Sequence, residues 1–108
     1  MSFDMCAKPF DLDDNAVRWV NDTFNAMTQE EKIAQLFVDM LWNDTGKQTA
    51  ALLGRYPSGG LRYNNRKPRE LYRQNAAAQK NSRIPLLIAA NVEAGGNGAM
   101  TGGTKIGE

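Results

Sequence analysis

The chain has no histidine, and Cys6 is its only cysteine. Without histidine, the chain by itself cannot build a Ser-His-Asp triad, a Cys-His pair or a histidine-ligated zinc site. A lone cysteine excludes a disulfide within the chain and a metal cluster held by several thiolates. We therefore expect no histidine-ligated zinc site and no cysteine metal cluster within the chain.

The sequence also lacks an excess of charge and a long apolar run. Its 13 basic and 12 acidic residues give a net charge of +1, which argues against nucleic acid or a membrane surface as a partner. No apolar run approaches the roughly 18 residues needed to span a membrane. The opening "MSFDMCAKPFDLDD" has neither a basic start nor an apolar segment, so we expect no signal peptide and a cytoplasmic location.

Helical patterns dominate the first third of the chain. In "NAVRWVNDTFNAM" apolar residues recur at helical spacing, with Asp13 or Asp14 available as the N-cap. Trp19 and Phe24 are expected to pack in a core. The clearest start signal is in "MTQEEKIAQLF", where Thr28 and Glu31 fit a capping box, in which each side chain accepts a hydrogen bond from the other residue's backbone N–H.

Apolar and helical segments then alternate. The predicted elements are a strand over residues 36–41, a helix over 47–53 ended by Gly54, a strand over 60–63, a helix over 68–82 begun by Pro68, and a strand over 86–92. This alternation is typical of an α/β fold with parallel strands and right-handed crossovers. The continuous apolar run of the last strand predicts cover on both faces. Because three parallel strands are few for a closed sheet, we expect residues 1–108 to be part of a larger domain.

The glycine-rich segment "NVEAGGNGAMTGGT" that follows suggests a phosphate-binding loop, but its spacing fails the known patterns. The Walker pattern requires a glycine before the lysine, and Thr104 precedes Lys105 here. The dinucleotide pattern requires a third glycine where Thr101 stands. Phosphate binding by this loop is therefore not expected.

Asn91 and Glu93 are the better candidates for a binding site. They follow the last predicted strand, and the carboxyl ends of parallel strands are where α/β folds gather ligand-binding groups. On an extended backbone, residues two apart point the same way, so an amide and a carboxylate would together face a polyhydroxylated ligand. The alternative is structural: Glu93 caps or pairs with the following loop, while Asn91 satisfies backbone groups. Both remain open at the level of the residues.

Three further features have a structural interpretation as well as a functional one. The segment "RYNNRKPR" over residues 62–69 carries four basic residues, for which a solvated loop is a commoner role than anion binding. Trp42 suits stacking on a sugar, but core or interface packing serves an aromatic ring equally well. Asp39 falls inside the first predicted strand and either points into a polar barrel centre or marks an early end of that strand.

Three stretches together resemble a known family. "MTQEEKIAQLFV", "YPSGGLRY" and "IPLLIAANVEAGG", in this order and spacing, resemble the N-terminal region of glycoside hydrolase family 3, which includes β-glucosidases and β-N-acetylglucosaminidases. The resemblance covers roughly residues 26–104. It implies the first part, about three β/α units, of a TIM-type (β/α)8 barrel that is incomplete in this chain.

The resemblance also implies a retaining mechanism, in which a nucleophile and an acid/base group stand about 5–5.5 Å apart. In the family both groups lie further along the barrel, so no catalytic residue is assigned in this chain. The family's aspartate that contacts sugar hydroxyls matches Asn91, and its glutamate matches Glu93. An amide at position 91 replaces a charge-assisted hydrogen bond by a neutral one, which leaves the sugar specificity open.

The leading hypothesis from this resemblance is a fragment of a retaining exo-β-glycosidase that hydrolyses terminal β-linked glucose or N-acetylglucosamine. The resemblance implies a hydrolase that uses no cofactor and no metal. Asn91 and Glu93 would bind the carbohydrate, and the fragment alone would be inactive. The alternative is a non-catalytic carbohydrate-binding module, or a half-barrel that self-associates through its open strand edges.

Overall fold

The structure is a computed structural model that describes residues 4–42 and 46–106. The chain forms two compact units, Met1–Lys32 and Ile33–Glu108. Each unit is described by itself below.

The first unit carries helix α1 (Asp14–Ala26), and helix α2 (Gln29–Ala34) begins at its end. Asp13 is the N-cap of α1, and its carboxylate accepts a 2.8 Å hydrogen bond from the backbone N–H of Ala16. The predicted capping box is confirmed: the N–H of Thr28 donates to Glu31 Oε2 at 2.8 Å, and the N–H of Glu31 donates to Thr28 Oγ1 at 3.2 Å.

The expected core around Trp19 and Phe24 is not formed within this unit. Helix α1 has no buried residue, and the two rings are 52% and 55% exposed. So short a segment offers too little apolar surface to enclose a core of its own. The Phe24 ring instead lies under the ammonium of Lys32, 4.0 Å from the ring centroid, a cation–π contact.

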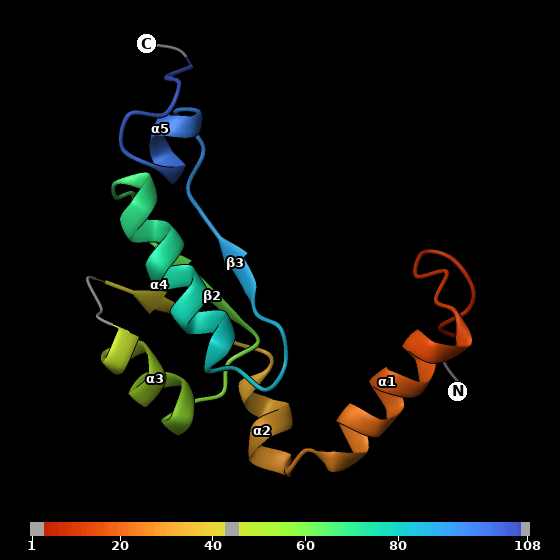
Figure 1. The fold of residues 1–108 in the computed structure, drawn as a ribbon. Helices are drawn as coiled ribbons and strands as arrows, with labels where there is room; N and C mark the ends of the chain where they lie inside the picture. The colour runs from red at the N-terminus through yellow and green to blue at the C-terminus, as the bar shows by residue number, and fades with distance from the viewer. Residues whose placement is uncertain (1–3, 43–45, 107–108) are drawn as a thin grey trace. The chain divides into compact units, whose positions relative to one another are not determined.

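The second unit is built on a parallel sheet, as the alternation predicted. Its elements are β1 (Val38–Leu41), α3 (Gly46–Arg55), β2 (Gly60–Tyr63), α4 (Pro68–Lys80), β3 (Leu87–Ala89) and the short α5 (Gly96–Ala99). The sheet has the order β1-β2-β3, and both neighbours of β2 run parallel to it. The α/β class is therefore confirmed (Figure 1).

Strand β2 and the start of α4 lie where they were predicted, whereas several other bounds differ: β1 begins at Val38 and not at residue 36, and α4 ends at Lys80 and not at residue 82. Gly54 does not end α3, which continues to Arg55; its position in the helix has open space around it and requires no unusual backbone angle. Strand β3 ends at Ala89 and not at residue 92. Its continuation leaves the sheet because the chain there turns to meet the glycine-rich segment.

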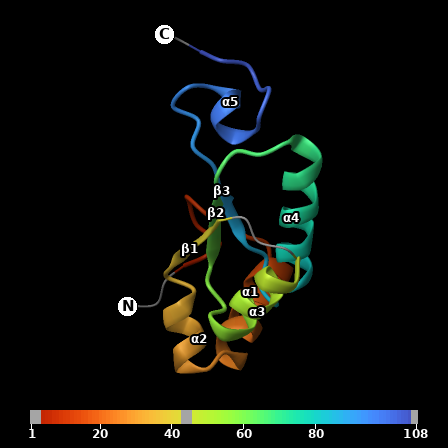
Figure 2. The ribbon, with the colours of Figure 1, turned by 90° about the vertical axis from the view of Figure 1, so that its left-hand side faces the viewer.

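One face of the sheet packs against α3 and α4 (Figures 1 and 2). The core on this face consists of Leu41, Leu53, Leu61, Ala78 and Leu86, with Leu52, Tyr63 and Ile88 packed against it. Asp39 pairs in register with Leu61, so strand alternation puts it on this same face. Both predicted roles of Asp39 are therefore wrong. Asp39 does not end the strand, and strand alternation does not point it toward the opposite face, where a barrel centre would lie.

The opposite face of the sheet is open in the part of the chain that the structure describes. A Cβ added at Gly60 would lie 3.1 Å from Val38 Cγ2 and 3.5 Å from Leu87 Cβ, which places these residues on one row of that face. Val38 is 60% exposed and Leu87 76% exposed. Within the described residues β3 is therefore covered on one face only, contrary to the prediction, because both helices lie on the other side of the sheet. The next row along this face is Met40, Arg62 and Ala89.

These faces predict opposite results for leucines of neighbouring strands. Leu61→Ala removes a side chain that is 1% exposed, and we expect it to lower the free energy of unfolding by about 2–5 kcal/mol. Leu87→Ala, the matched control on the open face, is expected to change it by no more than about 0.5 kcal/mol. Urea denaturation followed by circular dichroism measures both. Equal losses would contradict the assignment of the two faces.

Candidate functional site

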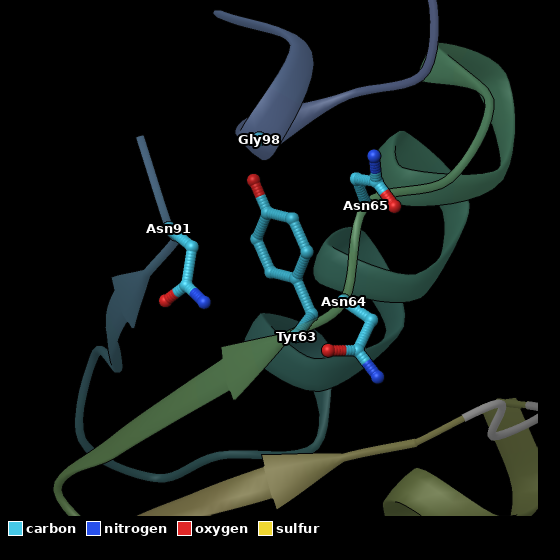
Figure 3. A pocket seen from close by; sticks show the side chains of 5 residues that line it. All are labelled: Tyr63, Asn64, Asn65, Asn91 and Gly98. Carbon is cyan, nitrogen blue, oxygen red and sulfur yellow. The ribbon is translucent and has the colours of Figure 1, made fainter. Parts of the chain in front are cut away.

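The carboxyl ends of β2 and β3 border an open pocket of about 220 Å³. It is lined by Tyr63, Asn64 and Asn65 from the end of β2 and the loop after it, by Asn91 from the segment after β3, and by Gly98 from α5. Figure 3 shows the Tyr63 ring between Asn91 on one side and Asn64 and Asn65 on the other, with its hydroxyl directed toward α5. The lining is polar and contains no ionisable group other than the Tyr63 phenol.

Arg62 holds Asn91 at the edge of this pocket. Its Nε donates a 3.0 Å hydrogen bond to Asn91 Oδ1. The sheet register explains the contact: Arg62 pairs with Ala89, and Asn91, two residues further on, leaves the strand from the same face. Sequence reasoning grouped Arg62 with the following loop and so missed this contact. The parallel pairing of the two strands was the signal that would have found it.

The glycine-rich segment packs directly on the residues that follow β3. A Cβ added at Gly98 would lie 2.1 Å from the backbone oxygen of Asn91, so only glycine permits this approach. Asn65 Nδ2 donates to the backbone oxygen of Asn97 at 2.8 Å, and the N–H of Thr101 donates to the backbone oxygen of Arg66 at 2.9 Å. The glycines therefore serve close backbone packing around the pocket, consistent with their failure to match a phosphate pattern.

The same segment closes on itself at its base. Gly95 and Lys105 form an antiparallel bridge, and the N–H of Ile106 donates to the backbone oxygen of Ala94 at 3.1 Å. Gly95 has a φ of 83°, in the left-handed region that favours glycine. The loop is thus a compact unit that supports one wall of the pocket, with its own network of backbone hydrogen bonds.

Glu93 does not lie on the extended backbone from which its role was predicted. The N–H of Gly95 donates to the backbone oxygen of Val92 at 2.9 Å, which puts Glu93 inside a turn. Its side chain is exposed and does not line the pocket. The argument from strand alternation therefore does not pair it with Asn91, and binding by either residue stays a prediction.

Neither Trp42 nor the four basic side chains of the segment 62–69 line the pocket, although Tyr63, Asn64 and Asn65 of that segment do. Trp42 directly follows β1 and is 67% exposed, so it has no core role within the described residues. In the basic segment, Arg66 forms an ion pair of 3.4 Å with Glu70 and donates from Nη1 to Gln74 Oε1 at 3.2 Å. Arg66 thus anchors the loop to the start of α4, a structural role.

Residues 4–42 and 46–106 contain neither a candidate metal cluster nor a candidate membrane-spanning helix. No group of three or more Cys, Asp or Glu side chains is arranged to hold a metal ion among them. No helix within these ranges is long and apolar enough to cross a membrane.

The chain matches known carbohydrate-active enzymes over nearly its whole length. It is 29% identical to a beta-N-acetylglucosaminidase/beta-glucosidase from Cellulomonas fimi over 104 residues. These aligned residues make up 96% of this chain and 18% of that protein. The beta-glucoside phosphorylase BglX bound to 2FGlc superimposes with a TM-score of 0.81 and 33% identity, over 94% of this chain and 19% of its own. A second structure, of beta-glucoside phosphorylase BglX, superimposes with a TM-score of 0.78 and 33% identity, over 94% of this chain and 18% of its own. No protein-family model matches the chain.

These matches confirm the predicted resemblance to the N-terminal region of glycoside hydrolase family 3 enzymes. The chain spans less than a fifth of the length of each of these relatives. One relative is named as a glycosidase and the other as a phosphorylase, and both names concern β-linked sugars.

The close approach at Gly98 gives a sharp prediction for stability. Gly98→Ala forces a Cβ against the Asn91 carbonyl, and we expect a loss of about 1–3 kcal/mol in the free energy of unfolding. Gly54→Ala is the matched control: no atom lies within 4 Å of its added Cβ, so alanine should stabilise α3 by about 0.4–1 kcal/mol. Thermal denaturation compares the two variants. If Gly98→Ala left the free energy of unfolding unchanged, the packing of α5 on Asn91 would be contradicted.

The Arg62 contact predicts how a carboxylate would behave at position 91. In Asn91→Asp, the guanidinium 3.0 Å from the native amide oxygen should lower the pKa of the new carboxyl below its unfolded value. A lowered pKa adds stability that is present above the unfolded pKa and is lost as the pH falls through the folded pKa. For an exposed pair we expect about 0.2–1 kcal/mol. NMR titration of that carboxyl measures the pKa. An unshifted pKa would show that Arg62 does not hold position 91.

Proposed function

We propose that this chain is the N-terminal part of the barrel domain of a retaining exo-β-glycosidase acting on terminal β-linked glucose or N-acetylglucosamine. In this proposal the chain supplies one corner of the sugar site, with Asn91 as its principal contact and Glu93 as a second contact from the adjacent turn. The remaining strands and the catalytic groups would belong to the rest of the barrel.

One observation carries the proposal. Asn91 lines a polar pocket at the carboxyl ends of two adjacent parallel strands and is held there by Arg62 at 3.0 Å. In β/α barrels this edge of the sheet is where substrates bind. An amide offers both donors and an acceptor, which suits the hydroxyls of a sugar. The relatives, whose names concern β-linked sugars, support the same chemistry.

The open face of the sheet supports the barrel part of the proposal. In a closed barrel, one face of the strands carries helices and the other faces the interior. Here α3 and α4 occupy one face, and Val38 and Leu87 are exposed on the other. These side chains would pack in the barrel interior, and β1 and β3 would pair with further strands.

We expect the 108 residues alone to be catalytically inactive, because the resemblance assigns the nucleophile and the acid/base group to later barrel units. Hydrolysis transfers the glycosyl group to water, and phosphorolysis transfers it to inorganic phosphate. The two solved structures are titled phosphorylases, so phosphorolysis is the second candidate reaction for the whole enzyme.

The purified chain tests this division between binding and catalysis. Assays with aryl β-glucoside and aryl β-N-acetylglucosaminide, each with and without inorganic phosphate, should show no turnover. Calorimetric titration with glucose should show weak binding that is reduced at least several-fold in Asn91→Ala, because the variant removes the hydrogen-bonding amide.

Turnover that Asn91→Ala abolishes would overturn the inactivity of the chain. Binding that is unchanged in Asn91→Ala would overturn the site. If the chain binds and forms a stable dimer in sedimentation experiments, the alternative of a self-associating carbohydrate-binding half-barrel is favoured. The exposed apolar side chains of the open sheet face are the specific observation behind that alternative.

A further inference from the structure

Two hydrogen bonds attach the glycine-rich segment to the loop between β2 and α4. Asn65 Nδ2 donates to the backbone oxygen of Asn97 at 2.8 Å, and the N–H of Thr101 donates to the backbone oxygen of Arg66 at 2.9 Å. Asn65 lines one side of the pocket, and Gly98, next to Asn97, lines another (Figure 3). The position of residues 65–66 therefore decides where two sides of the pocket lie.

The glycine-rich segment is also held together by its own backbone contacts. Gly95 forms a bridge with Lys105, and a Cβ added at Gly103 would overlap the backbone of Gly96. Such a segment is placed as a unit by what it rests on. It rests on the Asn91 carbonyl on one side and on residues 65–66 on the other.

The guanidinium of Arg66 attaches residues 65–66 to α4. Its Nη1 donates to Gln74 Oε1 at 3.2 Å, and its Nε lies 3.4 Å from Glu70 Oε2. The ion pair with Glu70 is open to water, since the two side chains are 28% and 47% exposed, and exposed pairs contribute little. The bond to Gln74 is partly buried and has a charged donor, which makes it the stronger attachment.

Gln74 is a polar residue on an otherwise apolar face of α4. The buried residues of this helix are Leu71, Gln74 and Ala78, whose spacing puts them on one face. Gln74 is 5% exposed, and its Nε2 has no hydrogen-bond partner among the described residues. A buried donor without a partner opposes folding, whereas a leucine of similar size would not. Packing alone therefore favours an apolar residue at this position, and what the glutamine adds is the bond to Arg66.

We propose that Gln74 and Arg66 are positioning residues for the sugar site. The buried amide of Gln74 holds the guanidinium of Arg66, and Arg66 holds the loop that carries Asn65 and accepts the hydrogen bond from Thr101. Neither side chain lines the pocket, so both act through Asn65 and the segment that carries α5. The proposal rests on the proposed function, since it concerns the same pocket.

Hydrogen exchange followed by NMR tests the positioning without a ligand. Gln74→Leu should speed exchange of the Thr101 amide several-fold, because the loop that carries its acceptor is released. The amide of Ile106, whose acceptor Ala94 lies at the base of the same segment, is the internal reference and should not change. Gln74→Glu keeps an acceptor oxygen for the guanidinium and should retain the slow exchange of Thr101.

Stability and sugar affinity should respond differently to the same variant. In urea denaturation, Gln74→Leu should leave the free energy of unfolding unchanged or raise it, because it removes a buried donor that has no partner. Calorimetric titration should nevertheless show several-fold weaker glucose binding in Gln74→Leu and in Arg66→Met. Arg69→Met, which removes an exposed positive charge from the same basic segment, is the matched control and should leave glucose binding and Thr101 exchange unchanged.

Four outcomes would overturn the inference. If Thr101 exchange is unchanged in both Gln74→Leu and Arg66→Met, the two residues do not position the loop. If exchange speeds up but glucose binding is unchanged, the loop does not shape the sugar site. If Gln74→Leu lowers the free energy of unfolding along with the affinity, Gln74 has an ordinary core role. If the unaltered chain binds no glucose, the inference fails together with the proposed function, and a Thr101 amide that still responds to Gln74→Leu identifies this case.

Discussion

Strand β2 pairs with β1 on one side and with β3 on the other, and all three strands run in the same direction. This pairing determines where every other feature of the second unit lies. Leu61 points to the helices and closes the core, while Arg62, the next residue, points to the open face. Because parallel strands end at the same edge, the residues that follow β2 and β3 meet there. A slip of one residue would exchange the two faces and separate Arg62 from Asn91.

Local signals in the sequence were sufficient for much of the fold. The capping box at Thr28 and Glu31, the strand "GLRY" and the helix begun by Pro68 depend on neighbouring residues, and the structure contains all three. Two bounds were missed for different reasons. Strand β3 ends early because Asn91 meets Gly98, and α3 passes Gly54 because nothing there requires a break. Neither fact is visible in a short window of sequence.

The candidate site shows the same division. Asn91 was a candidate because it follows an apolar strand, and the structure puts it on a pocket. Glu93 was paired with it on the assumption of an extended backbone, which the turn at Val92 replaces. Arg62 had been grouped with a solvated basic segment, because its contact depends on the register between two strands. Charge patterns along the sequence do not distinguish a strand arginine from those of the loop beside it.

The glycine-rich segment packs at the same edge of the sheet. Its glycines allow backbone to approach backbone, so α5 can rest on the Asn91 carbonyl and wall the pocket. A β-glycosidase site built this way would owe its sugar contacts in this corner to amide side chains such as that of Asn91. The carboxylates that retaining chemistry requires would come from elsewhere in the barrel. Binding and catalysis would then be divided between different parts of the enzyme.

The central claim is that a sugar binds at the carboxyl edge of β2 and β3 in contact with Asn91. A crystal structure of the protein soaked with a β-glycoside tests it most directly. The account predicts ligand oxygen within hydrogen-bonding distance of Asn91 Nδ2, with the Arg62 to Asn91 hydrogen bond retained. A glycoside bound elsewhere, with the pocket lined by Tyr63 and Asn91 left empty, would contradict it.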